Sequence, residues 1–169
     1  MGLHITKCPN RNIKYLVIHY TAGSTSKVGT AFNIYNAFVS RKASADFVVD
    51  DNTIIQCNPD IKNYYCWAIG DKLNQNSSGG YLYGKATNAN VISIEMCSNC
   101  SPNTTAAVSQ ANHSGWYFTD ATINKAIELA KIVMKKYNIP IENVIRHYDV
   151  SGKLCPGVIG WNKEAVYSL

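Results

Sequence analysis

The sequence predicts an α/β protein in which helices flank a central mixed β-sheet. Short runs of apolar and β-branched residues alternate with longer stretches whose apolar positions recur at helical spacing. Their order is strand, helix, three strands, helix, strand, helix, which favours a sheet covered by helices. The chain has 169 residues, 46% of them hydrophobic, and a single core usually divides only above roughly 250 residues. We therefore expect one domain over residues 1–169.

The first half of the chain predicts a buried strand, an amphipathic helix and a hairpin. Residues 14–19 (KYLVIH) form a short apolar run that is followed by Thr-Ala-Gly, as in a buried strand. Apolar residues at helical spacing predict a helix over residues 30–41. Residues 46–50 and 53–57 are strand-like, and the Asp-Asn pair between them tolerates the tight turn of a hairpin.

The second half predicts a long loop, two strands and two helices. Residues 58–90 are rich in Asn, Gly, Ser and Tyr and lack periodicity, which is typical of a loop that carries a binding surface. Residues 91–96 predict a strand. A long amphipathic helix follows, capped by Thr119. Residues 143–146 predict a short strand, and residues 161–168 predict a terminal helix.

Charge and hydropathy restrict the possible partners. The formal net charge of +5 would suit a cell wall that carries teichoic acid, a membrane surface or nucleic acid. No basic run exceeds two residues and no aromatic RNA-binding motif is present, so we do not expect a nucleic-acid partner. The chain has neither an apolar run of roughly 18 residues nor a charged and apolar leader. We therefore expect no membrane span and no signal peptide.

The six cysteines are expected to be mostly free thiols. A chain of this length without an export signal does not need disulfides to fold. Cys97 and Cys100 form a CxxC pair, but a zinc ribbon would need a second pair, and the sequence contains none.

Two histidines and one cysteine form a candidate metal site. A catalytic zinc ion usually takes three protein ligands and keeps a fourth position for water, whose pKa falls to roughly 7. His19 and His147 each end a predicted strand, and Cys155 lies in the loop after His147, so strand ends can bring them together. His19 considered by itself would be a core histidine that closes an apolar strand, but the other two residues favour the metal site. His4 and His113 lack such a setting and are expected at the surface.

Three separated motifs support this interpretation. They are IHYTA at residues 18–22, IE at 94–95, and RHYD at 146–149 followed by KLCP at 153–156. In this order they resemble the type 2 N-acetylmuramoyl-L-alanine amidases, which include phage endolysins and peptidoglycan recognition proteins. The resemblance runs from about residue 12 to 165. It implies a zinc groove at the strand ends of a mixed sheet, and hydrolysis of the amide between N-acetylmuramic acid and L-alanine in peptidoglycan.

The resemblance also assigns roles. It implies that the three candidate ligands bind Zn²⁺, that Glu95 is the general base, and that Lys153 stabilises the oxyanion. From the residues themselves, Glu95 could equally be a solvated carboxylate at a strand end, and Lys153 a loop charge. A ligand imidazole needs an acceptor on its second nitrogen, and Asp149 or a backbone carbonyl could serve.

Some positions in the expected groove depart from the family pattern. We expect Thr21, Asp46 and Trp67 to contact the substrate. Asp46 stands where relatives often have His or Tyr, and Ala68 where many have His, so the stem-peptide preference stays open. A tyrosine that contributes to the site in some phage members is replaced by Ala45. The loop aromatics that could either line the groove or anchor the loops are Tyr64, Tyr65, Trp67, Tyr81 and Tyr83.

The resemblance favours a lytic amidase, the catalytic part of a phage endolysin or an autolysin. We expect a monomer that is made in the bacterial cytoplasm and reaches the peptidoglycan when it is released at lysis; a further C-terminal wall-binding domain stays open. One alternative is a cytosolic amidase that recycles muropeptides and refuses intact wall. Another is a recognition module that binds peptidoglycan without cutting it, but such relatives commonly lose the ligand that Cys155 provides. A structural zinc protein would need a fourth ligand.

Overall fold

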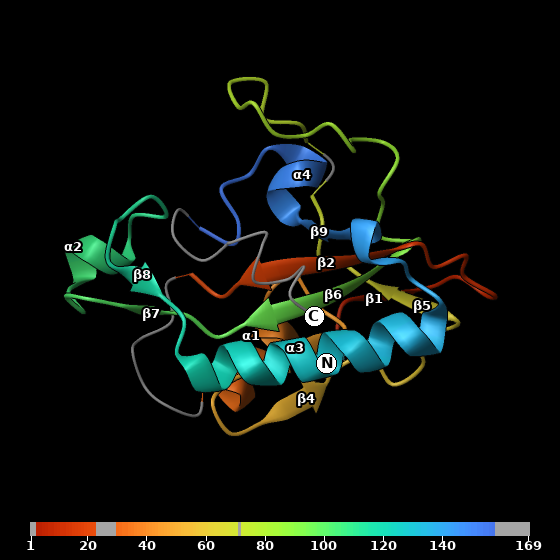
Figure 1. Ribbon diagram of the computed structural model, residues 1–169, viewed down its shortest axis with the longest axis horizontal. Helices are drawn as coiled ribbons and strands as arrows, with labels where there is room; N and C mark the ends of the chain where they lie inside the picture. The colour runs from red at the N-terminus through yellow and green to blue at the C-terminus, as the bar shows by residue number, and fades with distance from the viewer. Residues whose placement is uncertain (1–2, 23–29, 71, 158–169) are drawn as a thin grey trace.

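The protein is a layered α/β structure, seen here in a computed structural model that describes residues 3–22, 30–70 and 72–157. Figure 1 shows the central strands in the middle, with the long helix α3 along one side and the short helix α4 on the other. The α/β class and the mixed sheet predicted from the sequence are confirmed. The helix predicted over residues 161–168 lies outside the described residues.

The central sheet has five strands in the order β4-β3-β6-β2-β9. Its core is β2 (Tyr15–Tyr20), which pairs in parallel with β6 (Val91–Met96) on one side and with β9 (Val144–Arg146) on the other. β3 (Phe47–Val49) runs parallel to β6, and β4 (Ile54–Gln56) is antiparallel to β3. The predicted strands and the predicted hairpin are therefore confirmed, and the parallel strands share one C-terminal edge.

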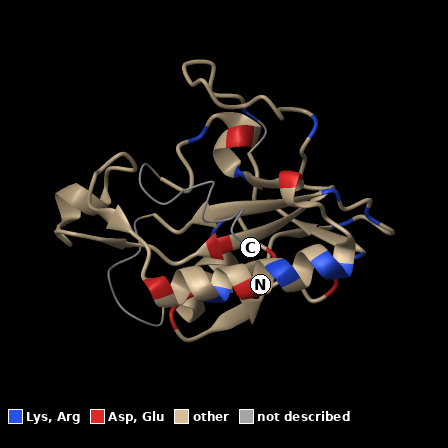
Figure 2. Ribbon diagram, in the orientation of Figure 1, with Lys and Arg blue, Asp and Glu red and all other residues tan. Residues whose placement is uncertain are grey.

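Helix α3 (Asp120–Tyr137) covers one face of the sheet. The hydroxyl of Thr119 accepts the backbone N–H of Thr122 at 3.1 Å, which is the predicted cap. Asn138 ends the helix in the left-handed conformation, with φ 54°. The helix has an acidic first turn and a basic last turn (Figure 2), charges that complement its dipole. The residues that α3 buries against the strands are Ala126, Leu129, Ala130 and Val133.

Helix α1 (Ala31–Ser40) packs against the opposite face, where Phe38 contacts the cluster around Val48 of β3. Successive strand residues point to opposite faces, so Val48 faces α1 while its neighbours face α3. Shorter helical segments include α2 (Thr105–Val108) and a 3₁₀ turn at Ile141–Asn143. No helix within the described part of the chain combines the length and the apolar character of a membrane span.

Helix α4 (His147–Ser151) corrects a sequence-based expectation. The sequence predicts that His147 ends a strand and that a loop follows, whereas β9 stops one residue earlier and His147 begins a helix. The carboxylate of Asp149 accepts the backbone N–H of Arg146 at 2.8 Å, which caps the first turn. Gly152 ends the helix with φ 73°. A five-residue helix is too short to show a hydrophobic period, so the pattern did not reveal it.

Two small antiparallel sheets lie outside the central sheet. β1 (Ile5–Lys7) pairs with β5 (Tyr64–Cys66), and β7 (Asn99–Cys100) pairs with β8 (Trp116–Tyr117). The long loop region predicted over residues 58–90 contains one short strand that the sequence did not predict, β5. Strands of two or three residues carry no alternating pattern, and their partners are distant in sequence. All six cysteines are free thiols, which agrees with the prediction.

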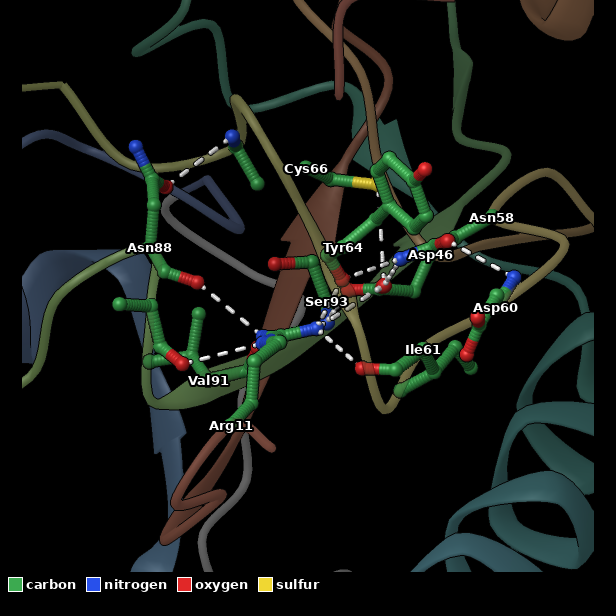
Figure 3. A network of polar contacts seen from close by, with 12 residues as sticks. Arg11, Asp46, Asn58, Asp60, Ile61, Tyr64, Cys66, Asn88, Val91 and Ser93 are labelled. Carbon is green, nitrogen blue, oxygen red and sulfur yellow. Dashed lines mark hydrogen bonds and ion pairs between the residues drawn. The ribbon is translucent and has the colours of Figure 1, made fainter. Parts of the chain in front are cut away.

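A buried arginine ties the N-terminal segment and the long loop to the sheet (Figure 3). The guanidinium of Arg11 donates to the carbonyl oxygens of Ile61 and Tyr64 at 2.9 and 2.7 Å, and to that of Ala89 at 3.0 Å. It also donates to the carbonyl oxygens of Asn88 and Val91. One side chain therefore binds five carbonyl groups from two segments, residues 61–64 and residues 88–91.

Asp46 completes this network. Its carboxylate lies 3.9 Å from the Arg11 guanidinium and accepts hydrogen bonds from the side chain of Asn58 at 2.7 Å and from the backbone N–H of Ser93 at 2.9 Å. Burial raises the pKa of Asp46, and the charge of Arg11 opposes that shift. Asp46 is only 1% exposed, so the expectation that it contacts the substrate is wrong. Its carboxylate instead contacts Arg11, Asn58 and Ser93 inside the protein.

We expect Arg11→Met to lower the free energy of unfolding by about 3–5 kcal/mol, because it leaves the buried carboxylate of Asp46 without its opposite charge and removes the guanidinium donor of five carbonyl groups. Urea unfolding followed by tryptophan fluorescence measures this loss. The exposed Arg41→Met is the matched control and should change stability by less than about 0.5 kcal/mol. Equal urea midpoints for the two variants would show that the Arg11 network does not hold the fold together.

Candidate metal centre

His19, His147 and Cys155 converge at the C-terminal edge of the parallel strands. His19 is the fifth residue of β2, and His147 follows the last residue of β9, its parallel neighbour. All three side chains are buried, and one potential ligand atom from each lies within 4.8 Å of the other two. The structure thus brings together the three residues that the sequence proposed as ligands.

A tight turn after α4 returns Cys155 to the histidines. The backbone N–H of Tyr148 donates to the carbonyl oxygen of Cys155 at 3.0 Å, which holds the two ends of the turn together. Gly152 makes the turn possible because its φ of 73° is in the left-handed region. A Cβ atom at this glycine would also lie 2.9 Å from the Cβ atom of Ser77.

The donor set fits a zinc ion. Nδ1 of His19 lies 3.7 Å from Sγ of Cys155, and tetrahedral zinc bonds would separate a nitrogen and a sulfur ligand by about 3.6 Å. Nε2 of His19 and Nδ1 of His147 are buried without a hydrogen-bond partner in the described structure. Such an unpaired buried group typically costs about 1–3 kcal/mol. The site thus combines a thiol that lies 3.7 Å from one imidazole nitrogen with two further imidazole nitrogens that lack a hydrogen-bond partner.

The electrostatic environment keeps both imidazoles neutral. Burial lowers the pKa of His19 well below its ordinary value, and the charges of His147 and Lys153 lower it further. Burial and Lys153 together lower the pKa of His147 to about 4. Neutral imidazole is the form that binds metals. Burial raises the pKa of Cys155 to about 12, so the protein by itself holds a thiol, and metal binding would have to release its proton.

Glu95 stands beside the candidate ligands. In the parallel register of β2 and β6 it lies opposite His19. Its Oε2 atom is buried without a hydrogen-bond partner in the described structure, and burial raises its pKa to about 8, although the charge of Lys153 opposes that shift. This is not the environment of a solvated carboxylate at a strand end.

A cavity of about 350 Å³ opens onto these groups. His19, Glu95 and Cys155 line it together with Thr21, which the sequence placed in the groove. A second cavity of about 870 Å³ lies beside it, and the residues that line both are Ala43, Trp67, Ala68, His147 and Lys153. The candidate metal centre is therefore at the junction of two cavities.

Trp67 forms part of that junction. Its side chain is 41% exposed, its indole N–H donates to the hydroxyl of Thr6 at 2.8 Å, and its ring lies 5.4 Å from that of His4. Tyr65 lines the larger cavity as well. The other loop aromatics (Tyr64, Tyr81 and Tyr83) are not among the residues that line either cavity.

Two features of the site differ from the sequence-based expectations. Asp149 does not orient an imidazole, because its carboxylate forms an ion pair with Arg146 at 2.6 Å. Besides Lys153, three basic residues that had no assigned role in the sequence analysis line the cavities, Arg41, Lys42 and Lys72. Two of them form a basic pair directly after α1, but only the tertiary structure shows that they face the site.

Comparisons with known proteins agree with this geometry. Residues 9–158 match the family described as N-acetylmuramoyl-L-alanine amidase. The chain is 29% identical over 151 residues to the N-acetylmuramoyl-L-alanine amidase CwlA of Bacillus subtilis (strain 168), which covers 89% of this chain and 46% of CwlA. It is 31% identical over 145 residues to CwlH of the same organism, covering 84% of this chain and 46% of CwlH. The chain thus spans about half the length of these relatives.

A solved structure supports the same similarity. The structure of PlyL superimposes with a TM-score of 0.60 and 30% sequence identity, and the match covers 89% of this chain and 78% of PlyL. The fold and the sequence motifs therefore point to the same group of proteins.

We expect the protein to bind one Zn²⁺ ion per chain, and Cys155→Ser to weaken this binding. Mutation of a residue that only hydrogen-bonds to a metal ligand typically lowers metal affinity by about 10- to 100-fold. Loss of a direct ligand should therefore lower the zinc affinity by more than about 100-fold. Competition with a chromogenic chelator measures the affinity. Cys8→Ser, which changes a cysteine outside the cluster, should leave the affinity unchanged. Equal zinc affinity of the Cys155 variant and the wild type would rule out this ligand set.

Proposed function

This chain belongs to the N-acetylmuramoyl-L-alanine amidase family, as its motifs predict, and we propose that it hydrolyses the amide between N-acetylmuramic acid and L-alanine in bacterial peptidoglycan. In this proposal His19, His147 and Cys155 bind Zn²⁺. The observation that carries it is the convergence of these three side chains with Glu95 and Lys153 on one cavity. CwlA and CwlH carry the name of this activity, which supports the proposed reaction.

A zinc ion held by these ligands would supply a Lewis acid and lower the pKa of water, the two effects that amide hydrolysis needs. The protein determines where the metal ion would be held. Two neutral imidazoles and one cysteine on three backbone segments fix the donor atoms, and the apolar residues of the strands exclude water from behind them.

Glu95 is the proposed proton carrier. Hydrolysis forms a bond between the water oxygen and the carbonyl carbon, breaks the C–N bond, and moves a proton from the water to the departing alanine nitrogen. A carboxyl group whose pKa is raised to about 8 can accept and return a proton near neutral pH, because its two protonation states are close in free energy. Its position opposite His19 places it where that transfer is needed.

Lys153 is the proposed partner of the developing oxyanion. Its ammonium lines the same cavity as Glu95, and its charge lowers the pKa of His19, His147 and Glu95, so it acts directly on the site. A fixed positive charge stabilises negative charge that forms on the carbonyl oxygen in the transition state. In the same proposal Thr21 and Trp67 contact the substrate, because they line the cavities at the site.

Digestion of purified Gram-positive peptidoglycan tests the reaction. We expect mass spectrometry to detect stem peptides with a new free L-alanine amine, and expect these products to disappear when a chelator removes the metal. Binding to the wall and retention of zinc without new L-alanine amines would instead identify a recognition module. Release of stem peptides from soluble muropeptides, but not from intact wall, would identify a recycling amidase.

Glu95→Gln tests the proton carrier. The amide keeps the shape of the carboxyl group but cannot exchange the proton, so we expect kcat to fall by about 100- to 10,000-fold while zinc affinity stays within a fewfold of the wild type. Glu128→Gln on the exposed side of α3 is the matched control and should retain wild-type turnover. A Glu95 variant that retains more than a tenth of the wild-type kcat would exclude this role.

A further inference from the structure

The described lining of the larger cavity contains three positively charged side chains. Lys42, Lys72 and Lys153 line it, and neither Asp nor Glu is present among the described residues of its lining. Lys42 and Lys72 form no ion pair with another described residue. The described lining of the smaller cavity contains two positively charged side chains, Arg41 and the shared Lys153, beside Glu95. The larger cavity therefore presents more positive side chains and suits the more anionic part of a ligand.

The uncharged residues of the two linings also differ. Tyr20, Ile34 and Phe38 line the smaller cavity, whereas the larger one combines the polar residues Thr6, Asn74 and Asn88 with Tyr65 and Ile69. The larger cavity, at about 870 Å³, is within the range of roughly 300–1,000 Å³ that small-ligand sites occupy.

The charge of the proposed substrate gives the direction of binding. The bond to be cut must lie at the junction, so the two halves of the substrate extend into different cavities. On the sugar side, the carboxyl group of muramic acid is consumed in the amide and is uncharged. On the peptide side, the chain ends in a carboxylate. The anionic half therefore matches the cavity that contains the lysines.

We propose that Lys42 and Lys72 form a subsite that binds a free carboxylate of the stem peptide and so directs the peptide into the larger cavity. This inference rests on the proposed amidase function, and it assigns to Lys42 and Lys72 a role in specificity and none in the chemical step. Lys42 follows α1 and Lys72 belongs to the long loop, so the subsite joins two separate parts of the fold.

Soluble N-acetylmuramoyl peptides of two to five residues test the subsite, with each carboxylate in turn converted to a carboxamide. Exposed ion pairs change binding by factors of about 1.4 to 5 each, so we expect amidation of the recognised carboxylate to raise the KM of the wild type about threefold to tenfold. In Lys42→Gln/Lys72→Gln the acid and amide substrates should become equivalent, and kcat should stay at the wild-type value. Lys131→Gln on α3 should retain the full discrimination.

The position of the sensitive carboxylate identifies its source, which is either the C-terminus of the peptide or an acidic side chain along it. Equal KM values of the wild type for every acid and amide pair would overturn the subsite. A lysine effect on intact wall that is absent with soluble peptides would also overturn it, and would indicate a wall polymer as the anion.

Calorimetry with the metal-free chain separates this inference from the proposed function. If carboxylate peptides bind more tightly than their amides through Lys42 and Lys72 but nothing is cut, the subsite stands and the proposed hydrolysis fails. If substrates are cut without regard to their carboxylates, the hydrolysis stands and the subsite fails.

Discussion

The parallel ladder between β2 and its two neighbours is the constraint on which the candidate site depends. Its register sets His19 opposite Glu95 on β6, and the pairing with β9 brings His147 to the same edge. Side chains alternate between faces, so the register that turns Ile18 and Ile94 toward α3 also turns His19 and Glu95 toward the cavity. A shift of the strand register by one residue would turn the core residues toward the cavity and the site residues toward the core.

Two of the buried polar clusters in the described structure differ in whether their polar atoms have hydrogen-bond partners. In the first, Arg11 and Asp46 have protein partners for their charges, and the result is a rigid link between the loop and the sheet. In the second, His19, His147 and Glu95 retain buried atoms without partners. Unpaired polar atoms concentrated at one strand edge are typical of a functional site, where a ligand or substrate provides the missing interaction.

Features with a local signature could be predicted from the sequence, whereas features that depend on tertiary contact could not. Apolar periodicity and turn residues gave the central strands, the hairpin, α1 and α3 with its Thr119 cap. The three-residue strands β1 and β5 pair with each other across a long separation in sequence, and α4 is capped by Asp149. The sequence shows that Asp46 is acidic, but not that it forms a buried ion pair with Arg11. It likewise does not show that Lys42 and Lys72, which are far apart in the chain, line the same cavity.

The ligands come from opposite ends of the described chain, since His19 and Cys155 are separated by 136 positions. A metal bound between them would act as a crosslink that closes nearly the whole chain into a loop. Because the ligands meet only in the folded chain, metal binding would add stability in proportion to the logarithm of the free metal concentration. The thermal stability of this protein would then depend on the zinc supply of its surroundings, and chelation would loosen the fold as well as remove the chemistry.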